Sequence, residues 1–197
     1  VDMAGDASVD VKSMFYGDQV EHLFPEVWEP RKDQEEALYK EFSIPGIKIL
    51  DFNMSISERD TVTSNSHIRA SVQKFASKTG SRLFIPVVPV SPFSAVLSKP
   101  KVRNIAFRFS AGWLDRDTIV ISIPTGFKVE AMPEKKTIES EFGTYKLTCS
   151  SDGSKIIVLR EMSLYRNTYT ADKYNAFVDF VNSSTKADRA FCVVKQQ

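Results

Sequence analysis

The chain has 197 residues and a mass of 22.2 kDa, which is enough for one generous domain or two small ones. Hydrophobic residues make up 42% of it and charged residues 26%. This balance is typical of a globular protein and excludes a disordered, collagen-like or coiled-coil chain. With 26 Lys and Arg against 25 Asp and Glu, the net charge is +1, so we expect no electrostatic attraction to nucleic acid or to an anionic membrane surface.

The apolar runs of the sequence are all short. The longest, such as Ile156 to Leu159, fall far below the ~20 residues that a helix needs to cross a bilayer. No basic and then apolar segment of the signal-peptide kind opens the chain, which starts at Val1. We therefore expect no membrane span, and we interpret the chain as a mature or trimmed piece of its gene product.

The first predicted elements are an edge strand and a helix. Residues 10–20 alternate weakly between apolar and polar side chains, which favours an edge strand. A helix is expected over 33–43, because Asp33 followed by Glu36 resembles a capping box. The Pro-Gly pair that comes after this segment is typical of a helix end.

Strands are predicted from residue 47 to residue 86. In the first of them, strict alternation would place Ile49 and Asp51 on one face and Phe52 on the other. Residues 68–73 also alternate, which indicates a half-buried antiparallel strand.

The segment 86–100 contains four prolines and little charge, so it is either a linker or a structured apolar loop. We favour a loop that closes one end of a sandwich. The reason is that Phe93, Val96 and Leu97 would be costly to expose in a solvated linker.

The second half of the chain again predicts strands, followed by a helix. Glycines and prolines punctuate it at roughly ten-residue spacing, which is the rhythm of an all-β sandwich or barrel. We interpret Gly126 and Gly143 as turn positions that need a positive φ. A helix is expected over 171–182, where Thr170 is the candidate N-cap and apolar residues recur with helical period until the polar run that begins at Asn182.

These patterns together predict a mainly β fold. We expect an antiparallel β-sandwich with two peripheral helices, over 33–43 and 171–182. The sandwich would be a single domain, 1–197, or two halves, 1–95 and 101–197, joined by segment 86–100.

The cysteines and histidines are few and scattered. Cys149, Cys192, His22 and His67 lack the close spacing that a structural zinc site uses, so we expect no metal and no other cofactor. The two cysteines could form one disulfide if their predicted strands are neighbours, and its loop closure would contribute about 4 kcal/mol. Two buried free thiols are the commoner arrangement.

No catalytic constellation is evident from the residues. A thiol nucleophile needs a histidine base and an orienting group. Cys149 is the candidate for a cysteine-dependent hydrolase or transamidase, but it lies in a strand-like run and not at a helix N-terminus. A second alternative is a carbohydrate-binding sandwich that uses Trp28 or Trp113, both of which lie beside loop residues and could instead cap the core.

The second half of the sequence carries a familiar order of residues. It runs through the segments Ile123–Pro133, Glu141–Tyr145, Ile156–Arg160, Tyr169–Tyr174 and Lys186–Asp188, with Gly80–Pro86 before them. This order resembles the C-terminal domain of unknown function that follows a transglutaminase-like core in large exported bacterial proteins.

The resemblance implies a function without chemistry of its own. In that family the catalytic Cys, His and Asp belong to the upstream core, and no position here matches them. The chain is then expected to be a non-catalytic accessory or interaction domain, in the periplasm or at the cell surface. Its partner would be the transglutaminase-like core of the same polypeptide, or another protein or peptide. Arg160 is expected to pair with a carboxylate across the sheet.

Overall fold

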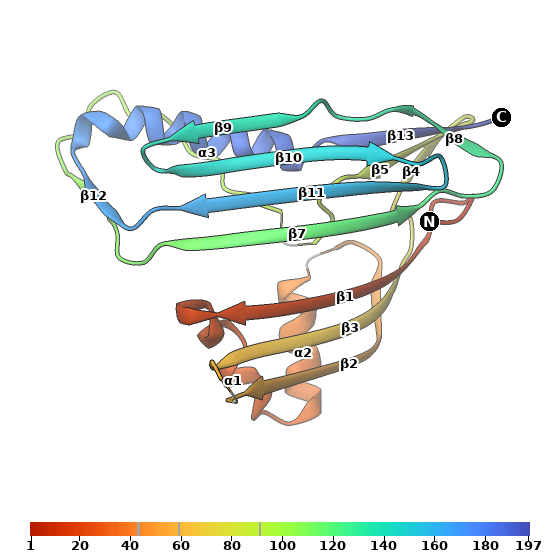
Figure 1. The fold of residues 1–197 in the computed structure, drawn as a ribbon, viewed down its shortest axis with the longest axis horizontal. Coiled ribbons are helices and arrows are strands. Elements are labelled where there is room, and N and C mark those ends of the chain that lie inside the picture. The colour runs from red at the N-terminus through yellow and green to blue at the C-terminus, as the bar shows by residue number, and fades with distance from the viewer. Residues whose placement is uncertain (43, 59, 91) are drawn as a thin grey trace. The chain divides into compact units, whose positions relative to one another are not determined.

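The chain forms two compact units, Val1–Lys78 and Thr79–Gln197. The computed structural model describes residues 1–42, 44–58, 60–90 and 92–197, and only the backbone of residues 22, 24 and 25. Each unit contains at least one antiparallel sheet and one helix that is longer than the short helical turns beside it (Figure 1). None of the helices in these ranges is long and apolar enough to span a membrane.

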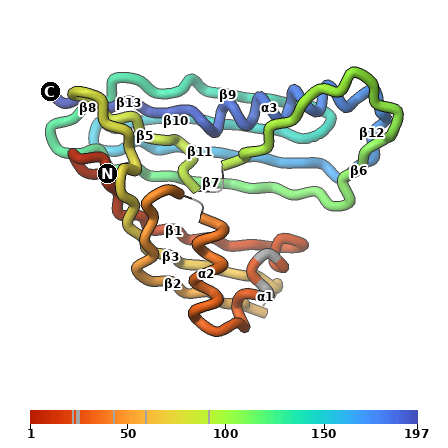
Figure 2. The backbone as a smooth tube through the Cα atoms, turned by 180° about the vertical axis from the view of Figure 1, so that it is seen from behind, coloured from red at the N-terminus to blue at the C-terminus, as the bar shows by residue number. Residues whose placement is uncertain are grey.

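The first unit is a three-stranded antiparallel sheet with its helices. Its elements are β1 (Ala7–Tyr16), the 3-10 helix η1 (Gly17–His22), α1 (Phe24–Val27), α2 (Arg31–Glu41), β2 (Ile47–Ser57) and β3 (Thr63–Val72), and the strand order is β1-β3-β2. Helix α2 covers one face of this sheet, as both views show (Figures 1 and 2). The buried side chains of that layer are Leu38, Phe42, Ile49, Phe52, Ile68, Ala70 and Val72.

A bulge in β2 overturns the alternation predicted for this strand. Ile49 pairs with Ala70 and Asp51 with Arg69, so the register shifts between Ile49 and Asp51. The extra residue, Leu50, reverses the phase of the residues that follow it. As a result Ile49 and Phe52 are both buried, whereas Asp51 is exposed.

Helix α2 begins two residues earlier than predicted. Pro30 is its N-cap, and the Pro30 carbonyl oxygen accepts hydrogen bonds from the backbone N–H groups of Asp33 and Gln34. No side chain caps this end, so the capping box is wrong. The helix ends at Glu41, and Ser43, at the predicted end, lies outside the described residues.

The second unit contains a large sheet and two smaller ones. The large sheet has the order β7 (Trp113–Ser122), β11 (Lys155–Leu164), β10 (Gly143–Ser151) and β9 (Lys136–Ser140), and all its pairs are antiparallel. A smaller sheet has the order β5 (Arg82–Pro86), β13 (Phe191–Gln196) and β8 (Phe127–Ala131), and β6 (Phe107–Phe109) pairs with β12 (Asn167–Tyr169). Strand β4 (Ser77–Thr79) carries the chain from the first unit into the second.

Helix α3 (Tyr174–Asp188) follows a 3-10 turn, η2 (Ala171–Lys173), and is longer than predicted. The polar residues from Asn182 onward, which predicted the end of this helix, form hydrogen bonds within the second unit. The Ser184 hydroxyl donates to the Phe180 carbonyl oxygen at 3.0 Å, and the Asn182 side chain exchanges two 2.9 Å hydrogen bonds with the backbone of Leu97. The helix therefore continues to Asp188, past the predicted end at residue 182.

The second unit is a two-layer sandwich. Helix α3 and the β5-β13-β8 sheet lie on the same side of the large sheet, as the opposite views show (Figures 1 and 2). Alternate residues of the large sheet are buried against this layer, namely Tyr145, Leu147, Ile156, Val158 and Met162. The predicted mainly β, antiparallel fold with two peripheral helices is confirmed.

Candidate functional site

A buried arginine lies at the centre of the second unit. Arg160 is on the inward face of β11, between Val158 and Met162, and its side chain is 2% exposed. Its Nη1 atom donates to Asp117 Oδ2 at 2.7 Å, and its Nε atom donates to Asp188 Oδ1 at 2.9 Å. Asp117 lies directly opposite Arg160 in the β7–β11 register, so the structure has the predicted ion pair across the sheet.

Asp188 closes this cluster at the C-terminal end of α3. Its Oδ1 atom accepts from the Tyr145 hydroxyl at 2.5 Å, and its Oδ2 atom accepts from the backbone N–H of Phe93 at 2.7 Å. A carboxylate at the C-terminus of a helix meets an unfavourable dipole, and these donors and Arg160 offset that cost with charge-assisted hydrogen bonds. The cluster thereby ties α3, the large sheet and the segment 86–100 together.

The surroundings of the cluster shift the pKa of its outer members. Burial raises the pKa of Asp117, although the hydrogen bond from Arg160 opposes this effect. Burial also raises the pKa of Tyr145 far above its ordinary value, and the hydrogen bond that the phenol donates to Asp188 adds to the shift. The tyrosine therefore stays neutral where an exposed phenol would ionise.

Cys149 and Cys192 are free thiols in the second unit. Cys149 is half-buried on β10, and Cys192 is fully buried on β13. The hydrogen bond from Cys192 lowers the pKa of Cys149. The same hydrogen bond, together with burial, raises the pKa of Cys192.

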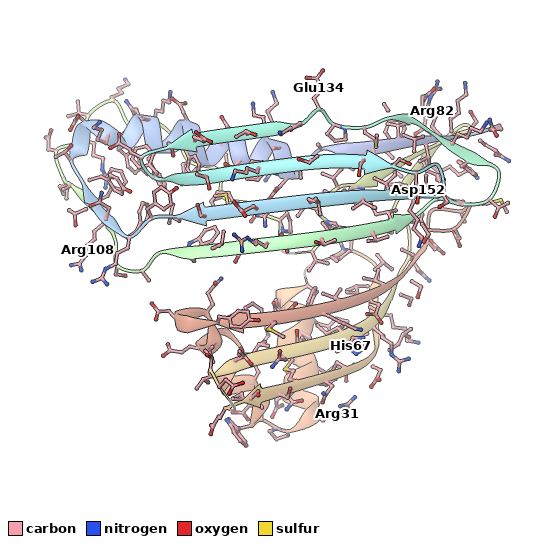
Figure 3. The ribbon with its side chains drawn as sticks, viewed as in Figure 1. Arg31, His67, Arg82, Arg108, Glu134 and Asp152 are labelled. Atoms are coloured by element: carbon pink, nitrogen blue, oxygen red, sulfur yellow. The ribbon has the colours of Figure 1, made fainter. Side chains whose placement is uncertain are left out.

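The histidine needed for thiol catalysis is not in the same unit as Cys149. His67 belongs to the first unit (Figure 3), where its Nε2 atom lies 3.0 Å from Asp10 Oδ2. The side chain of His22 lies outside the described residues. Across the described ranges, no group of three His, Cys, Asp or Glu side chains could hold a metal ion.

The two tryptophans proposed as ligand contacts belong to different units. Trp28 follows α1 in the first unit and is 74% exposed. Trp113 begins β7 in the second unit, where it is half-buried with its ring centroid 6.3 Å from that of Phe93. They do not form one binding surface within either unit.

The outward face of the large sheet has an apolar strip that the sequence analysis missed. Val120 on β7 and Leu159 on β11 are 55% and 52% exposed, and the strip consists of these two side chains with Ile157. Next to the strip, Glu161 accepts from Arg116 at 2.8 Å and from Lys146 at 3.3 Å. The signal was present in the uninterrupted apolar runs Ile119–Ile121 and Ile156–Leu159, because a strand with one solvated face should alternate.

The sequence model of one family matches residues 81–194, more than half of the chain. That family is described as a domain of unknown function with a solved structure, DUF3858. The chain belongs to the DUF3858 family. All members of the Arg160 cluster, both cysteines and the apolar strip lie inside the DUF3858 match. The expected resemblance to a domain of unknown function is thus confirmed.

Part of the chain resembles a solved structure. A crystal structure of a putative protease from Parabacteroides distasonis aligns with 50% of the chain at 18% identity and a TM-score of 0.43. The aligned part makes up only 19% of that structure's chain. None of the curated proteins compared with the sequence matches it.

Proposed function

We propose that the chain is a non-catalytic accessory domain of a larger exported protein with a transglutaminase-like or protease-like core. In this proposal it works in the periplasm or at the cell surface, and it docks on the core of its own polypeptide through the outward face of the large sheet. Membership of the DUF3858 family supports a domain role. The apolar strip carries the docking part of the proposal.

The strip has the composition of a protein interface. Val120 and Ile157 are direct cross-strand partners, and Leu159 lies on the same face two residues along β11. Exposed apolar side chains with the ion-paired Glu161 and Arg116 beside them match the apolar core and polar rim of a protein–protein contact. Burying Val120 and Leu159 would stabilise a complex by roughly 25 cal/mol per Å² of apolar surface removed from water.

The first test is the reading frame upstream of the codon for Val1, which should encode a signal peptide and a Cys, His and Asp core. The encoded core and this chain are then produced separately, and their affinity is measured by calorimetry. We expect Val120→Lys and Leu159→Lys to weaken binding by about tenfold or more, because each places a charge in the contact.

The matched control is Asn175→Lys, which adds the same charge at an exposed position of helix α3, in the other layer of the sandwich. It should leave the affinity unchanged. Equal affinity for all three variants and the unmodified chain would disprove docking through this face. Circular dichroism of each variant shows that the fold is intact, since every substituted side chain is exposed.

A further inference from the structure

The segment 92–100 forms a strap that runs along α3 (Figure 2). Side chains of α3 hydrogen-bond the backbone of every second strap residue: Asp188 binds the Phe93 N–H at 2.7 Å, Thr185 the Ala95 carbonyl at 2.6 Å, and Asn182 both backbone groups of Leu97 at 2.9 Å. A repeat of two residues is the repeat of an extended strand. The strap is therefore a strand whose first edge is paired with polar side chains of a helix.

The second edge of the strap is unpaired. In an extended strand the N–H and C=O groups of successive residues point to opposite edges, so those of Ser94, Val96 and Ser98 point away from α3. Among the described residues, none is hydrogen-bonded to these backbone groups. All three residues are exposed, and the exposed fraction of Val96 is 66%. A free edge of this kind is a template for another strand.

The strap lacks the devices that usually protect such an edge. Proteins block their edge strands with charged side chains, with proline or with a bulge. From Phe93 to Ser98 the sequence has no charged residue and no proline, and Pro92 and Pro100 bracket this stretch. The free edge is therefore short, and it offers main-chain donors and acceptors around one exposed apolar side chain, that of Val96.

We propose that a second copy of this chain occupies the free edge, so that two straps pair as antiparallel strands about a two-fold axis at Val96. Residues 94–98 read Ser-Ala-Val-Leu-Ser, so their outward positions are serine, valine and serine in either direction. The axis places Val96 opposite Val96 of the second copy, and Ser94 opposite Ser98. Each of these pairs exchanges two N–H···O bonds. A self-complementary edge is what a two-fold dimer requires.

The charges of the strap are compatible with this register. Its one cation, Lys99, is ion-paired with Asp179 of α3 at 2.7 Å, and the axis places Lys99 opposite Phe93 and not opposite a second lysine. The two Val96 side chains lie on the same face of the joined straps, where each removes apolar surface of the other from water. Because the paired edge is short, we expect a weak dimer.

The test is the mass of the whole chain by sedimentation equilibrium, as its concentration rises from about 10 µM to about 1 mM. We expect the average mass to rise from 22.2 kDa toward twice that value. Val96→Pro should abolish the rise, because proline has no N–H to donate, and the strap's bonds to α3 use other residues. The matched control is Val102→Pro, the same exchange at an exposed position beyond the strap, which should dimerise like the unmodified chain.

A constant mass of 22.2 kDa at all concentrations would overturn the proposal. So would a folded Val96→Pro variant that dimerises as well as the unmodified chain. Circular dichroism shows whether each variant is folded.

Amide hydrogen exchange by NMR tests the same contact without a substitution. At the high concentration the Val96 N–H should exchange about twofold more slowly or better, whereas the N–H groups of Phe93 and Leu97 are already bonded to α3 and should not change. Leu159→Lys, on the outward face of the large sheet, should leave the dimer intact. Unchanged exchange at Val96, or loss of the dimer in Leu159→Lys, would assign self-association to another surface and overturn the proposal.

Discussion

Arg160 on β11 and Asp188 at the end of α3 form an ion pair with side chains that are 2% and 0% exposed. They are 28 residues apart in the sequence, and Arg160 Nε donates to both carboxylate oxygens of Asp188, at 2.9 and 3.1 Å. A buried pair of this kind adds little over an apolar pair of equal size, but removing one partner leaves an uncompensated charge. It therefore fixes where α3 ends on the sheet.

We predict that Asp188→Asn destabilises the second unit by about 3–5 kcal/mol, because Arg160 then keeps only Asp117 as a charged partner. The free energy of unfolding in urea measures this loss. The matched control is Asp179→Asn on the same helix, where an exposed carboxylate pairs with Lys99. That change should cost less than about 1 kcal/mol, and an equal cost for both variants would contradict the account.

Tyr145 should make the fold sensitive to alkali. Its folded-state pKa lies above that of an exposed phenol, so the folded state holds the proton more tightly than the unfolded state does. The protonated Tyr145 therefore stabilises the folded state fully below about pH 10, and this stabilisation is lost as the pH rises further. Tyr145→Phe should remove this part of the pH dependence, and Tyr165→Phe, at an exposed position, should not.

Thermal midpoints between about pH 8 and 11 measure the effect. Tyr145→Phe should also lower stability at neutral pH by about 1–3 kcal/mol, because Asp188 loses a hydrogen bond in a buried place. A variant that unfolds in alkali with the same slope as the unmodified chain would show that Tyr145 is not the group responsible.

The first unit should lose stability in acid. The hydrogen bond from Arg69 at 2.8 Å lowers the pKa of Asp51, and Arg31 lies 3.1 Å from the other oxygen. A lowered folded-state pKa stabilises the fold above the unfolded-state value of about 3.9, and the benefit disappears as the pH falls through that region. Asp51→Asn should therefore reduce the loss of stability of the first unit as the pH falls.

Hydrogen exchange of β3 peptides reports on the first unit alone. The control is Asp33→Asn, at an exposed position of α2. If hydrogen exchange depends on acid pH in the same way in Asp51→Asn and Asp33→Asn, the contact between Arg69 and Asp51 contributes nothing to the acid sensitivity of the first unit.

Gly143 should not tolerate a side chain. A Cβ atom at this position would clash with the backbone carbonyl of Ser163 on the neighbouring strand. We predict that Gly143→Ala destabilises the second unit by about 1–3 kcal/mol, the usual cost of overpacking. Ser150→Ala, at an exposed position of the same strand, is the control in the same urea titration, and a similar midpoint for both would refute the prediction.

Gly143 also shows what the sequence could and could not predict. Both Gly126 and Gly143 were expected at positions of positive φ, and Gly126 has a φ of +81°. Gly143 has no such conformation and is required by the close approach of another strand. Local patterns predict turns, whereas contacts between distant strands have no local signal.

The same distinction explains the other differences. Alternation predicted the strands, but the bulge at Leu50 adds one residue that no periodic pattern contains. The polar run from Asn182 predicted a helix end, and its bonds to Leu97 and Phe180 allow the helix to continue. Arg160 was expected to face a carboxylate, and Asp117 does so because the register places it there.

In the proposed function, the outward face of the large sheet is covered in the full-length protein. Hydrogen exchange followed by mass spectrometry tests it by comparing β7 and β11 in this chain alone with the same strands in the complete polypeptide. We expect slower exchange of Trp113–Ser122 in the complete polypeptide, with Phe191–Gln196 in the other layer unchanged. If β7 and β11 exchange at the same rate in this chain alone and in the complete polypeptide, docking through this face is contradicted.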